Sequence, residues 1–268
     1  MEDKGYMSEN NNHANKTKVS PSLKGILGML SFSTRIPINT YITIEEMAGS
    51  VILWPYIGLF IGIVASVIAY ITTFLLGFNS LLTAGIVYSF LIWFMGFNHL
   101  DGVMDMGDGL MVHGDSQKRL AIMRDSMVGT GGIATFFIVS TLTVIALSSI
   151  PTLILIPSIL TMEMASKFSM ISTMVIGNDD EKGIGRLIKS GINTKILMIC
   201  AVVNAIIGYL ILGIPGVCAV IIALLTGLYL ARMANKTFGC VTGDIMGASN
   251  EIARLTSLLI IIIITNIL

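Results

Sequence analysis

Charged residues are scarce in this sequence. Asp, Glu, Lys and Arg make up 12% of its 268 residues, whereas a soluble globular domain contains about 25%. Hydrophobic residues account for 54%, and the mean hydropathy is +0.85. These values exclude an ordinary soluble protein and predict an all-α, polytopic integral membrane protein that is embedded in a lipid bilayer. The formal net charge is zero, so nothing in the composition indicates a nucleic-acid partner.

The sequence also lacks closely spaced cysteine pairs and the pattern of a signal peptide at its start. Cys200, Cys218 and Cys240 have no CxxC spacing, which argues against a disulfide framework or a zinc site and favours buried, inert thiols. The first residues, MEDKGYMSENNNHANKTK, lack the apolar core of a signal peptide. We therefore expect a disordered polar tail over residues 1–22 and a single membrane-embedded domain over residues 23–268.

Long apolar stretches, by contrast, are frequent. An amphipathic segment at 23–36, which ends before Pro37, predicts an interfacial helix. The final apolar stretch, 255–268, is short for a full span, so it either begins in the preceding segment or lies partly buried. The predicted transmembrane helices, which must satisfy their own backbone groups in lipid, are 50–76, 80–98, 132–150, 153–176, 195–212, 215–231 and 255–268.

The charged residues are concentrated on one side of these predicted spans. Of the 16 Lys and Arg residues, all but Lys167 lie before residue 50 or in the connections 99–131, 177–195 and 232–254. The acids follow the same rule, with Glu163 as the exception. The positive-inside rule then places the N-terminus and every charged connection in the cytoplasm, in a multi-pass protein of the cell membrane. Polar chemistry on one face favours an enzyme with a cytoplasm-facing active site over a transporter.

The segment HLDGVMDMGDGLMVHGD, residues 99–115, places aspartates beside glycines directly after an uncharged run. On a helix, Asp101, Asp105 and Asp108 would lie within an arc of about 60°. A cation would remove the repulsion among them, and Mg²⁺ suits such oxygen ligands because it usually takes one or two carboxylates plus substrate phosphates. The intervening glycines are expected to let phosphates approach the backbone. The alternative is a solvated loop whose acids only keep it in water.

A second polar cluster, QKRLAIMRDSMVGTGG, leads into the next span. Arg124, followed by Asp125, is expected to grip a phosphate. The glycine-rich run from Asp125 through Ser126 to Gly129 would form an anion site at the start of a helix. The alternative is that Asp125 or Ser126 caps this helix and that the glycines help helices to pack.

A third cluster, CVTGDIMGASNEIAR, places Asp244 and Glu251 on one helical face, with Asn250 beside them. For His99, and for the pair Glu163 and Lys167, the sequence allows two interpretations each. His99 is either a donor behind the metal ligands or a structural histidine at a helix end. Glu163 and Lys167, four residues apart within an apolar stretch, either form a structural ion pair or line the active cavity.

In this order within a multi-span chain, HLDGVMDMGDGL, IMRDSMVGTGG and TGDIMGASNE resemble the cobalamin synthase family, the adenosylcobinamide-GDP ribazoletransferases. SFSTRIPI, near the start, is similar to the N-terminal segment of that family, so the resemblance covers about residues 25–255. One departure is Met106-Gly107, where many members carry Thr-Ala between the aspartates. This change does not affect the expected ligands.

The resemblance implies a transferase that joins adenosylcobinamide-GDP to α-ribazole or its 5'-phosphate and releases GMP. It also implies Mg²⁺ as cofactor, so that catalysis consists chiefly of positioning and charge neutralisation. In this reading, Mg²⁺ is held by Asp101, Asp105 and Asp108. Arg124 offsets phosphate charge, and Asp244 or Glu251 binds metal or orients the ribazole hydroxyl. The expected substrate contacts are His99, Asp125, Ser126, Gly129 and Asn250. Whether the chain forms a homo-oligomer stays open.

Two rival functions remain. A CDP-alcohol phosphotransferase-like lipid headgroup enzyme shares Mg²⁺ and aspartates at helix ends. Its usual signature begins with DGxxAR, whereas Asp101-Gly102 here is followed by Met104-Asp105 with no Ala-Arg, which counts against it. A secondary transporter would use the aspartates as a gate and would depend on Glu163 and Lys167 instead.

Overall fold

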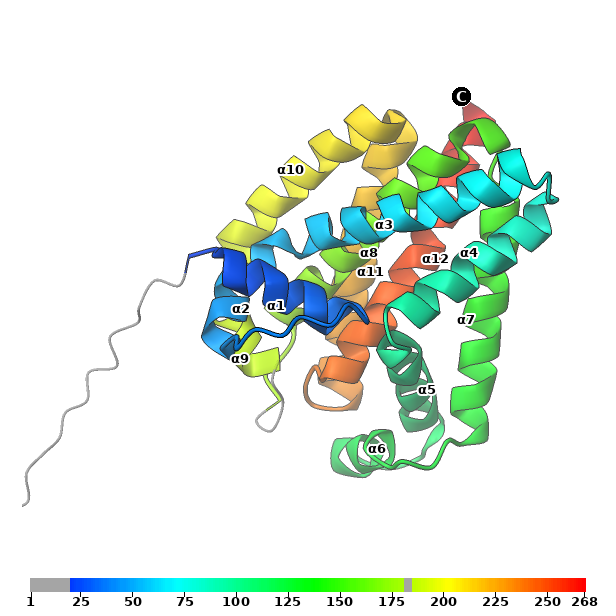
Figure 1. Ribbon diagram of the computed structural model, residues 1–268. Coiled ribbons are helices and arrows are strands. Elements are labelled where there is room, and N and C mark those ends of the chain that lie inside the picture. Colours follow the sequence, from blue (N-terminus) through cyan, green and yellow to red (C-terminus); the bar gives the residue numbers. More distant parts are fainter. Residues whose placement is uncertain (1–19, 181–184) are drawn as a thin grey trace, which may run out of the picture.

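The computed structural model describes residues 20–180 and 185–268 and confirms the all-α prediction. Most of the tail expected at 1–22 falls outside these residues. In the described part of the chain there is no β-strand, only an isolated bridge between Asp179 and Val241. The α-helices in chain order (Figure 1) are α1 (Leu23–Ser33), α2 (Ile44–Ser50), α3 (Trp54–Tyr70), α4 (Ser80–Phe94), α5 (Asn98–Met111), α6 (Ser116–Met123), α7 (Thr130–Ser148), α8 (Leu155–Ile176), α9 (Gly185–Lys189), α10 (Thr194–Leu212), α11 (Ile214–Thr237) and α12 (Gly243–Ile267).

Six helical stretches of the described chain are long and apolar enough to cross a membrane, which confirms a polytopic membrane protein. Short 3-10 and π segments extend two of them. A seventh stretch passes the same test only if α4 and α5 are counted together, and these two helices are bent by 91°. The six are Ile44–Leu75, Thr130–Ser148, Thr152–Ile176, Thr194–Leu212, Ile214–Thr237 and Gly243–Ile267.

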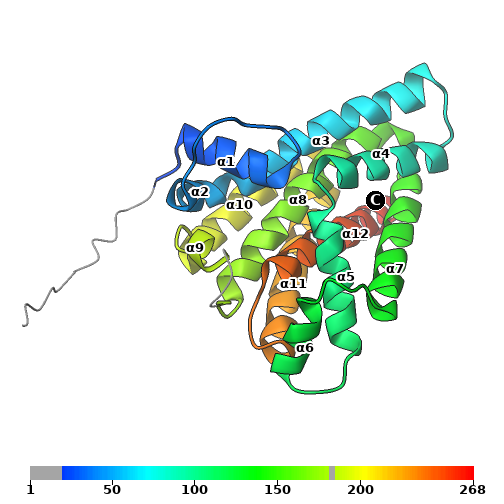
Figure 2. The same ribbon diagram turned by 60° about the horizontal axis from the view of Figure 1, so that its bottom comes forward.

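The predicted span 80–98 is therefore too long at its C-terminal end. Helix α4 stops at Phe94, and α5 leaves in a new direction (Figures 1 and 2). Gly96 and Phe97 have φ values of 76° and 65°, and two consecutive left-handed residues cannot continue a right-handed helix. We call residues 95–97 the elbow. The N-terminal segment supports it, because the backbone N–H of Arg35 donates to the Phe94 carbonyl at 2.8 Å.

Other predicted boundaries also differ: the first span begins at Ile44 rather than at 50, and α11 continues to Thr237 rather than ending at 231. The final apolar stretch is the second half of α12, a 25-residue helix that begins in the polar cluster at Gly243, as one of the two sequence alternatives held. Thr242 caps its start by accepting a hydrogen bond from the Ile245 N–H. Helix α1 ends at Ser33, before the predicted position 36, because Thr34 adopts an extended conformation.

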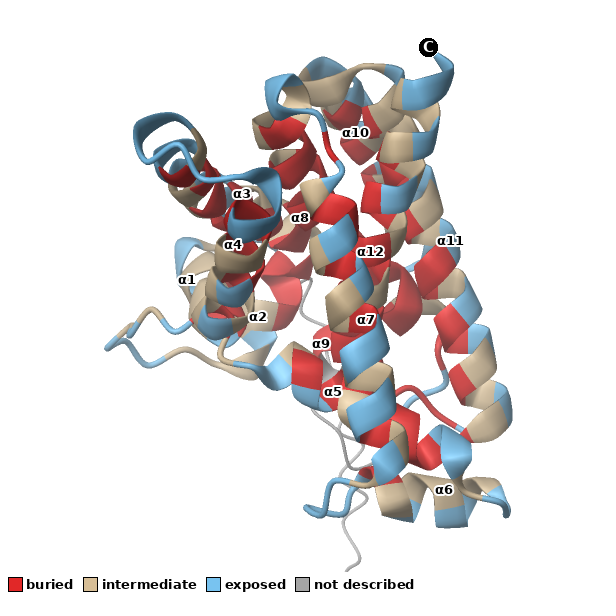
Figure 3. Ribbon diagram, turned by 90° about the vertical axis from the view of Figure 1, so that its right-hand side faces the viewer, coloured by how far each residue is buried: buried red, intermediate tan, exposed pale blue. Residues whose placement is uncertain are grey.

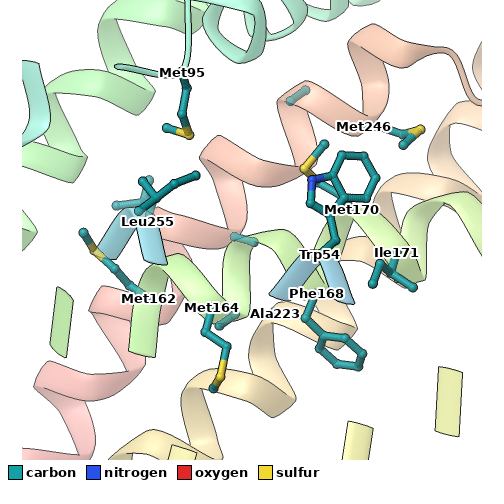
Figure 4. Packing of buried hydrophobic residues seen from close by; sticks show 14 of the residues in the cluster. Trp54, Met95, Met162, Met164, Phe168, Met170, Ile171, Ala223, Met246 and Leu255 are labelled. Carbon is teal, nitrogen blue, oxygen red and sulfur yellow. The ribbon is translucent and has the colours of Figure 1, made fainter. Parts of the chain in front are cut away.

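Helix α8 lies at the centre of the bundle. In α8, 78% of the apolar span is buried within the protein. In α10, which lies on the outside of the bundle, the corresponding share is 22%. Burial in Figure 3 follows the same pattern, with the inward faces of α8 and α12 covered by their neighbours. The core is rich in methionine: Met162, Met164 and Met170 of α8 belong to one buried cluster, and Figure 4 shows Met164 beside Ala223 of α11. This centre also holds the buried charges described below.

Candidate active site

Helix α5 carries all three aspartates of the 99–115 motif, as the spacing predicts. It packs against α12 on one side and α7 on the other. Asp101 is exposed, Asp105 is half-buried and Asp108 is buried, so the three carboxylates meet different surroundings. The predicted helical face exists, but its members are not equivalent.

Asp105 lies among other carboxylates. Burial raises the pKa of Asp105, and the charges of Asp101, Asp244 and Asp108 raise it further, to about 7. Helix α5 lies outside the six spans, at the end of the bundle that also carries α6 (Figure 2). Asp244 comes from the first turn of α12, where the Thr242 hydroxyl donates to its Oδ2 at 3.2 Å. We call Asp101, Asp105 and Asp244 the acidic cluster.

Asp108 is engaged by the backbone of another helix. Its Oδ2 accepts from the Gly129 N–H at 2.6 Å, and its Oδ1 accepts from the Gly132 N–H at 2.7 Å. Gly129 is the N-cap residue of α7 and has no side chain, so Asp108 serves as the cap from α5. The anion site expected at the start of this helix is thus occupied by the protein's own carboxylate.

The glycines of α5 do not open its backbone to a ligand, and that expectation is wrong. They lie where helices cross. A Cβ on Gly102 would come within 2.3 Å of the Asp244 carbonyl oxygen, and one on Gly107 within 2.5 Å of Thr135 Oγ1. Gly109 faces Met123 in the same way. These positions need glycine so that α5 can approach α12, α7 and α6 closely.

Arg124 connects the end of α6 to the segment that follows α8. Arg124 follows α6 directly, and its Nη2 donates to both carboxylate oxygens of Asp180 at 2.9 Å. Its charge also acts on Asp244, which places the guanidinium near the acidic cluster. Asp125 and Ser126 are exposed; Asp125 accepts from the Met127 N–H and neither residue caps α7. The capping alternative for these two residues is therefore wrong.

Glu251 and Asn250 lie in a fully buried network of charged and polar side chains. Arg254 donates from Nε to Glu163 Oε1 at 2.6 Å and from Nη1 to Glu251 Oε2. Lys167 Nζ donates to Asn250 Oδ1 at 2.9 Å. Each of these five residues is 0% exposed, and the two acids balance the two bases. Both carboxylates pair with Arg254, and the Lys167 ammonium donates to the Asn250 amide, so each buried charge has a hydrogen-bond partner.

The network revises the interpretation of Glu163. Its ion-pair partner is Arg254, 91 residues away, rather than Lys167 four residues along the helix. The sequence reasoning counted Arg254 only as a connection charge, although its spacing of three from Glu251 indicated a shared helical face. Tyr88 was also missed; its hydroxyl donates to Glu251 Oε2 at 3.2 Å.

His99, in the first turn of α5, lies beside the network. Its Nδ1 lies 4.0 Å from Glu251 Oε1, beyond hydrogen-bond reach, and this atom is buried without a hydrogen-bond partner. Burial, together with the charges of Lys167 and Arg254, lowers the pKa of His99 well below its ordinary value, so the imidazole is neutral. His99 therefore lies on the network side of α5.

The acidic cluster offers only carboxylate oxygens, the ligands that Mg²⁺ prefers. Within residues 20–180 and 185–268, no three His, Cys, Asp or Glu side chains are arranged to hold a metal by themselves. An ion here would therefore need further oxygens from a substrate, which is the usual situation for Mg²⁺ bound to phosphates. The residues fit a shared metal–phosphate site and do not form a closed protein cage.

Comparison with known proteins identifies the family of the chain. The model of a family described as cobalamin-5-phosphate synthase matches residues 25–262. The chain is 32% identical over 248 residues to the adenosylcobinamide-GDP ribazoletransferase of Picrophilus torridus, covering 90% of this chain and 98% of that protein. The relatives of the same name from Methanosarcina mazei and Pyrococcus abyssi are 29% and 30% identical, over 86% and 87% of this chain and 88% and 95% of theirs. No solved structure matches. The chain belongs to the cobalamin-5-phosphate synthase family.

Proposed function

We propose that this protein transfers α-ribazole, or its 5'-phosphate, onto adenosylcobinamide-GDP in a Mg²⁺-dependent reaction that releases GMP. The name of its relatives supports the reaction. The observation that carries the chemistry is the acidic cluster, which α5 and α12 build from three carboxylates whose charges repel one another. A site of this kind favours a cation together with the phosphate oxygens that complete its coordination.

The reaction forms a bond between the ribazole hydroxyl oxygen and the phosphorus linked to cobinamide. It breaks the bond between that phosphorus and the oxygen that bridges the two phosphates, so GMP leaves with the bridging oxygen and the proton of the hydroxyl is released. When bound, Mg²⁺ would supply positive charge to the diphosphate. Asp101, Asp105 and Asp244 would hold the ion, and each carboxylate must be deprotonated to do so. Arg124, near Asp244, would turn from Asp180 to offset phosphate charge.

Asp108 and the buried network would act indirectly. Asp108 holds α5 against α7, and Gly102 allows α5 to pack closely against α12. The distance between the aspartates of α5 and Asp244 of α12 is thereby fixed. The network holds α8 and α12 together behind them. Rigid supports of this kind matter because phosphoryl transfer depends on positioning.

The proposed orientation places the acidic cluster in the cytoplasm. The charged connections 99–131, 177–195 and 232–254 support this side under the positive-inside rule. A thiol introduced by Ser126→Cys, in a chain with Cys200, Cys218 and Cys240 replaced by serine, tests it. Labelling of inverted but not right-side-out vesicles by an impermeant maleimide is expected, and the reverse pattern would contradict the orientation.

The activity is tested with protein purified in detergent or liposomes, given adenosylcobinamide-GDP, α-ribazole 5'-phosphate and Mg²⁺. GMP and the corrinoid product are followed with and without EDTA. Wild type should form both products only with Mg²⁺, and Asp105→Asn should form neither. Asp179→Asn, in an exposed ion pair with Lys189, serves as the control and should behave as wild type. Inactive but folded wild type would overturn the proposal, and a parallel assay with a CDP-alcohol donor addresses the lipid-headgroup alternative.

A further inference from the structure

A cavity lies beside the acidic cluster, at the elbow between α4 and α5. Its volume is about 470 Å³, within the range of small-molecule sites. The walls are mostly apolar and come from α4, the elbow, α5 and α7, with Ile92, Phe97, Met104 and Phe136 among them. Asp101 also lines it, so this elbow cavity and the acidic cluster share one residue.

Phe97 is held in the elbow cavity at a conformational cost. Its φ of 65° is the one left-handed value at a non-glycine position among the residues that the structure describes. A bulky residue in this region costs of order 1 kcal/mol or more, and such strain persists mainly at functional sites. Phe97 as a whole residue is 48% exposed although it lines a cavity, so it has free surface to offer a ligand.

From this geometry, and resting on the proposed function, we propose that the elbow cavity binds the flat bicyclic base of α-ribazole. Phe97 of the elbow and Phe136 of α7 supply aromatic surfaces, and an aromatic base stacks on such surfaces. The ribosyl part would then extend past Asp101 toward the acidic cluster, where its hydroxyl must meet the diphosphate. A purely aliphatic ligand would leave the Asp101 carboxylate and the Asn98 amide in the wall without a hydrogen-bond partner.

Three variants test the assignment. Phe136→Ala removes one aromatic surface, and Phe97→Gly removes the other while relieving the strained backbone. Phe137→Ala is the matched control, because Phe137 is the next residue of α7, is 65% exposed and does not line the cavity. Binding of α-ribazole alone is measured by equilibrium dialysis, and KM is measured for each substrate. Thermal unfolding reports whether each variant is folded.

Phe136→Ala and Phe97→Gly are each expected to raise the Kd and the KM for α-ribazole by about tenfold, the loss of one base–aromatic contact. The KM for adenosylcobinamide-GDP should stay within about twofold of wild type in all three variants, an allowance of less than 0.5 kcal/mol. Phe97→Gly should melt no lower than wild type, because glycine accepts its φ.

Unchanged α-ribazole binding in both folded variants would overturn the assignment. A change confined to the KM for adenosylcobinamide-GDP would also overturn it, since the cavity would then hold part of the other substrate. Loss of co-purified lipid with unchanged α-ribazole binding would identify an acyl-chain site instead. If wild type binds α-ribazole in the cavity but forms no GMP, the proposed function fails and the binding site stands.

Discussion

The carboxylate of Asp108 accepts a 2.6 Å hydrogen bond from the backbone N–H of Gly129, so one helix of the site caps another. This contact gives Asp108 a different role from its neighbours on α5. Its two oxygens are directed at α7, while Asp101 and Asp105 remain available to a ligand.

Asp108→Asn should therefore lower stability. An amide can accept only with its carbonyl oxygen, so one of the two N–H groups of α7 loses its partner. The expected cost is about 1–2 kcal/mol, typical of a lost helix cap. Thermal unfolding in detergent without Mg²⁺ measures it. An unchanged melting temperature, together with a raised Mg²⁺ requirement for product formation, would show that Asp108 is a metal ligand instead.

Gly102→Ala should separate α5 from α12. The new methyl group would lie 2.3 Å from the Asp244 carbonyl oxygen, so the helices must shift apart and carry Asp101 and Asp105 with them. Overpacking of this kind costs about 1–3 kcal/mol, and a displacement near 1 Å can reduce turnover by about 100-fold. GMP release and thermal unfolding check both effects.

Gly85→Ala is the control for this change, because a Cβ added to Gly85 in α4 would have no atom within 4 Å. Alanine there should leave activity unaltered and should not lower the melting temperature, since alanine favours a helix over glycine by about 1 kcal/mol. Equal activity in the two alanine variants would mean that the α5–α12 spacing does not control the reaction.

Asp105→Asn should stabilise the metal-free protein relative to wild type by an amount that grows as the pH rises from about 4 to 7 and then levels off. The folded pKa of about 7 lies above the ordinary value of 3.8, so the contribution of Asp105 to stability is present at pH 4 and is lost as the pH rises through 7. The uncharged amide avoids that loss. Above pH 7.5 we expect its melting temperature to exceed that of wild type by about 2 °C, a modest figure because solvent screens a half-exposed carboxylate.

Near pH 4 the two proteins should melt together, which makes the acidic measurement an internal control. Excess Mg²⁺ at pH 8 should raise the melting temperature of wild type more than that of Asp105→Asn, because only wild type presents all three charges. A constant difference between the proteins across this pH range would mean that Asp105 does not titrate there.

Glu163→Gln should be strongly destabilising. It removes one partner from the buried guanidinium of Arg254, and breaking a buried pair in this way costs about 3–5 kcal/mol. Asp179→Asn breaks the exposed pair with Lys189 and should cost less than about 1 kcal/mol. Chemical unfolding in mixed micelles compares the two. Equal and small effects would indicate that water reaches the network.

The sequence predicts the helical class, the apolar stretches and the helix that carries Asp101, Asp105 and Asp108, because hydropathy and charge spacing are local properties. It does not predict the elbow, since Gly96 is a single glycine in an apolar run and Phe97 has no intrinsic preference for a left-handed backbone. The first half of α12 was read as a separate polar cluster for a similar reason. Its polar residues are buried by α5 and α8, and burial by a neighbour cannot be read from local composition.

The partners within the site are the least predictable part. Asp108 pairs with the start of α7, and Glu163 pairs with Arg254 across 91 residues, so both contacts depend on how helices are arranged in space. The glycines of α5 illustrate the same limit. Their spacing is compatible with a phosphate or with a neighbouring helix, and only the packed bundle distinguishes the two.

The balanced charges of the buried network also constrain how the family can diverge. Arg254 pairs with both Glu163 and Glu251, so an apolar residue at position 254 alone would leave two buried carboxylates without their guanidinium. Exchange of Glu163 and Arg254 together would still leave Glu251 without its partner. A related chain that has lost the guanidinium at position 254 should therefore have changed at both acidic positions, 163 and 251.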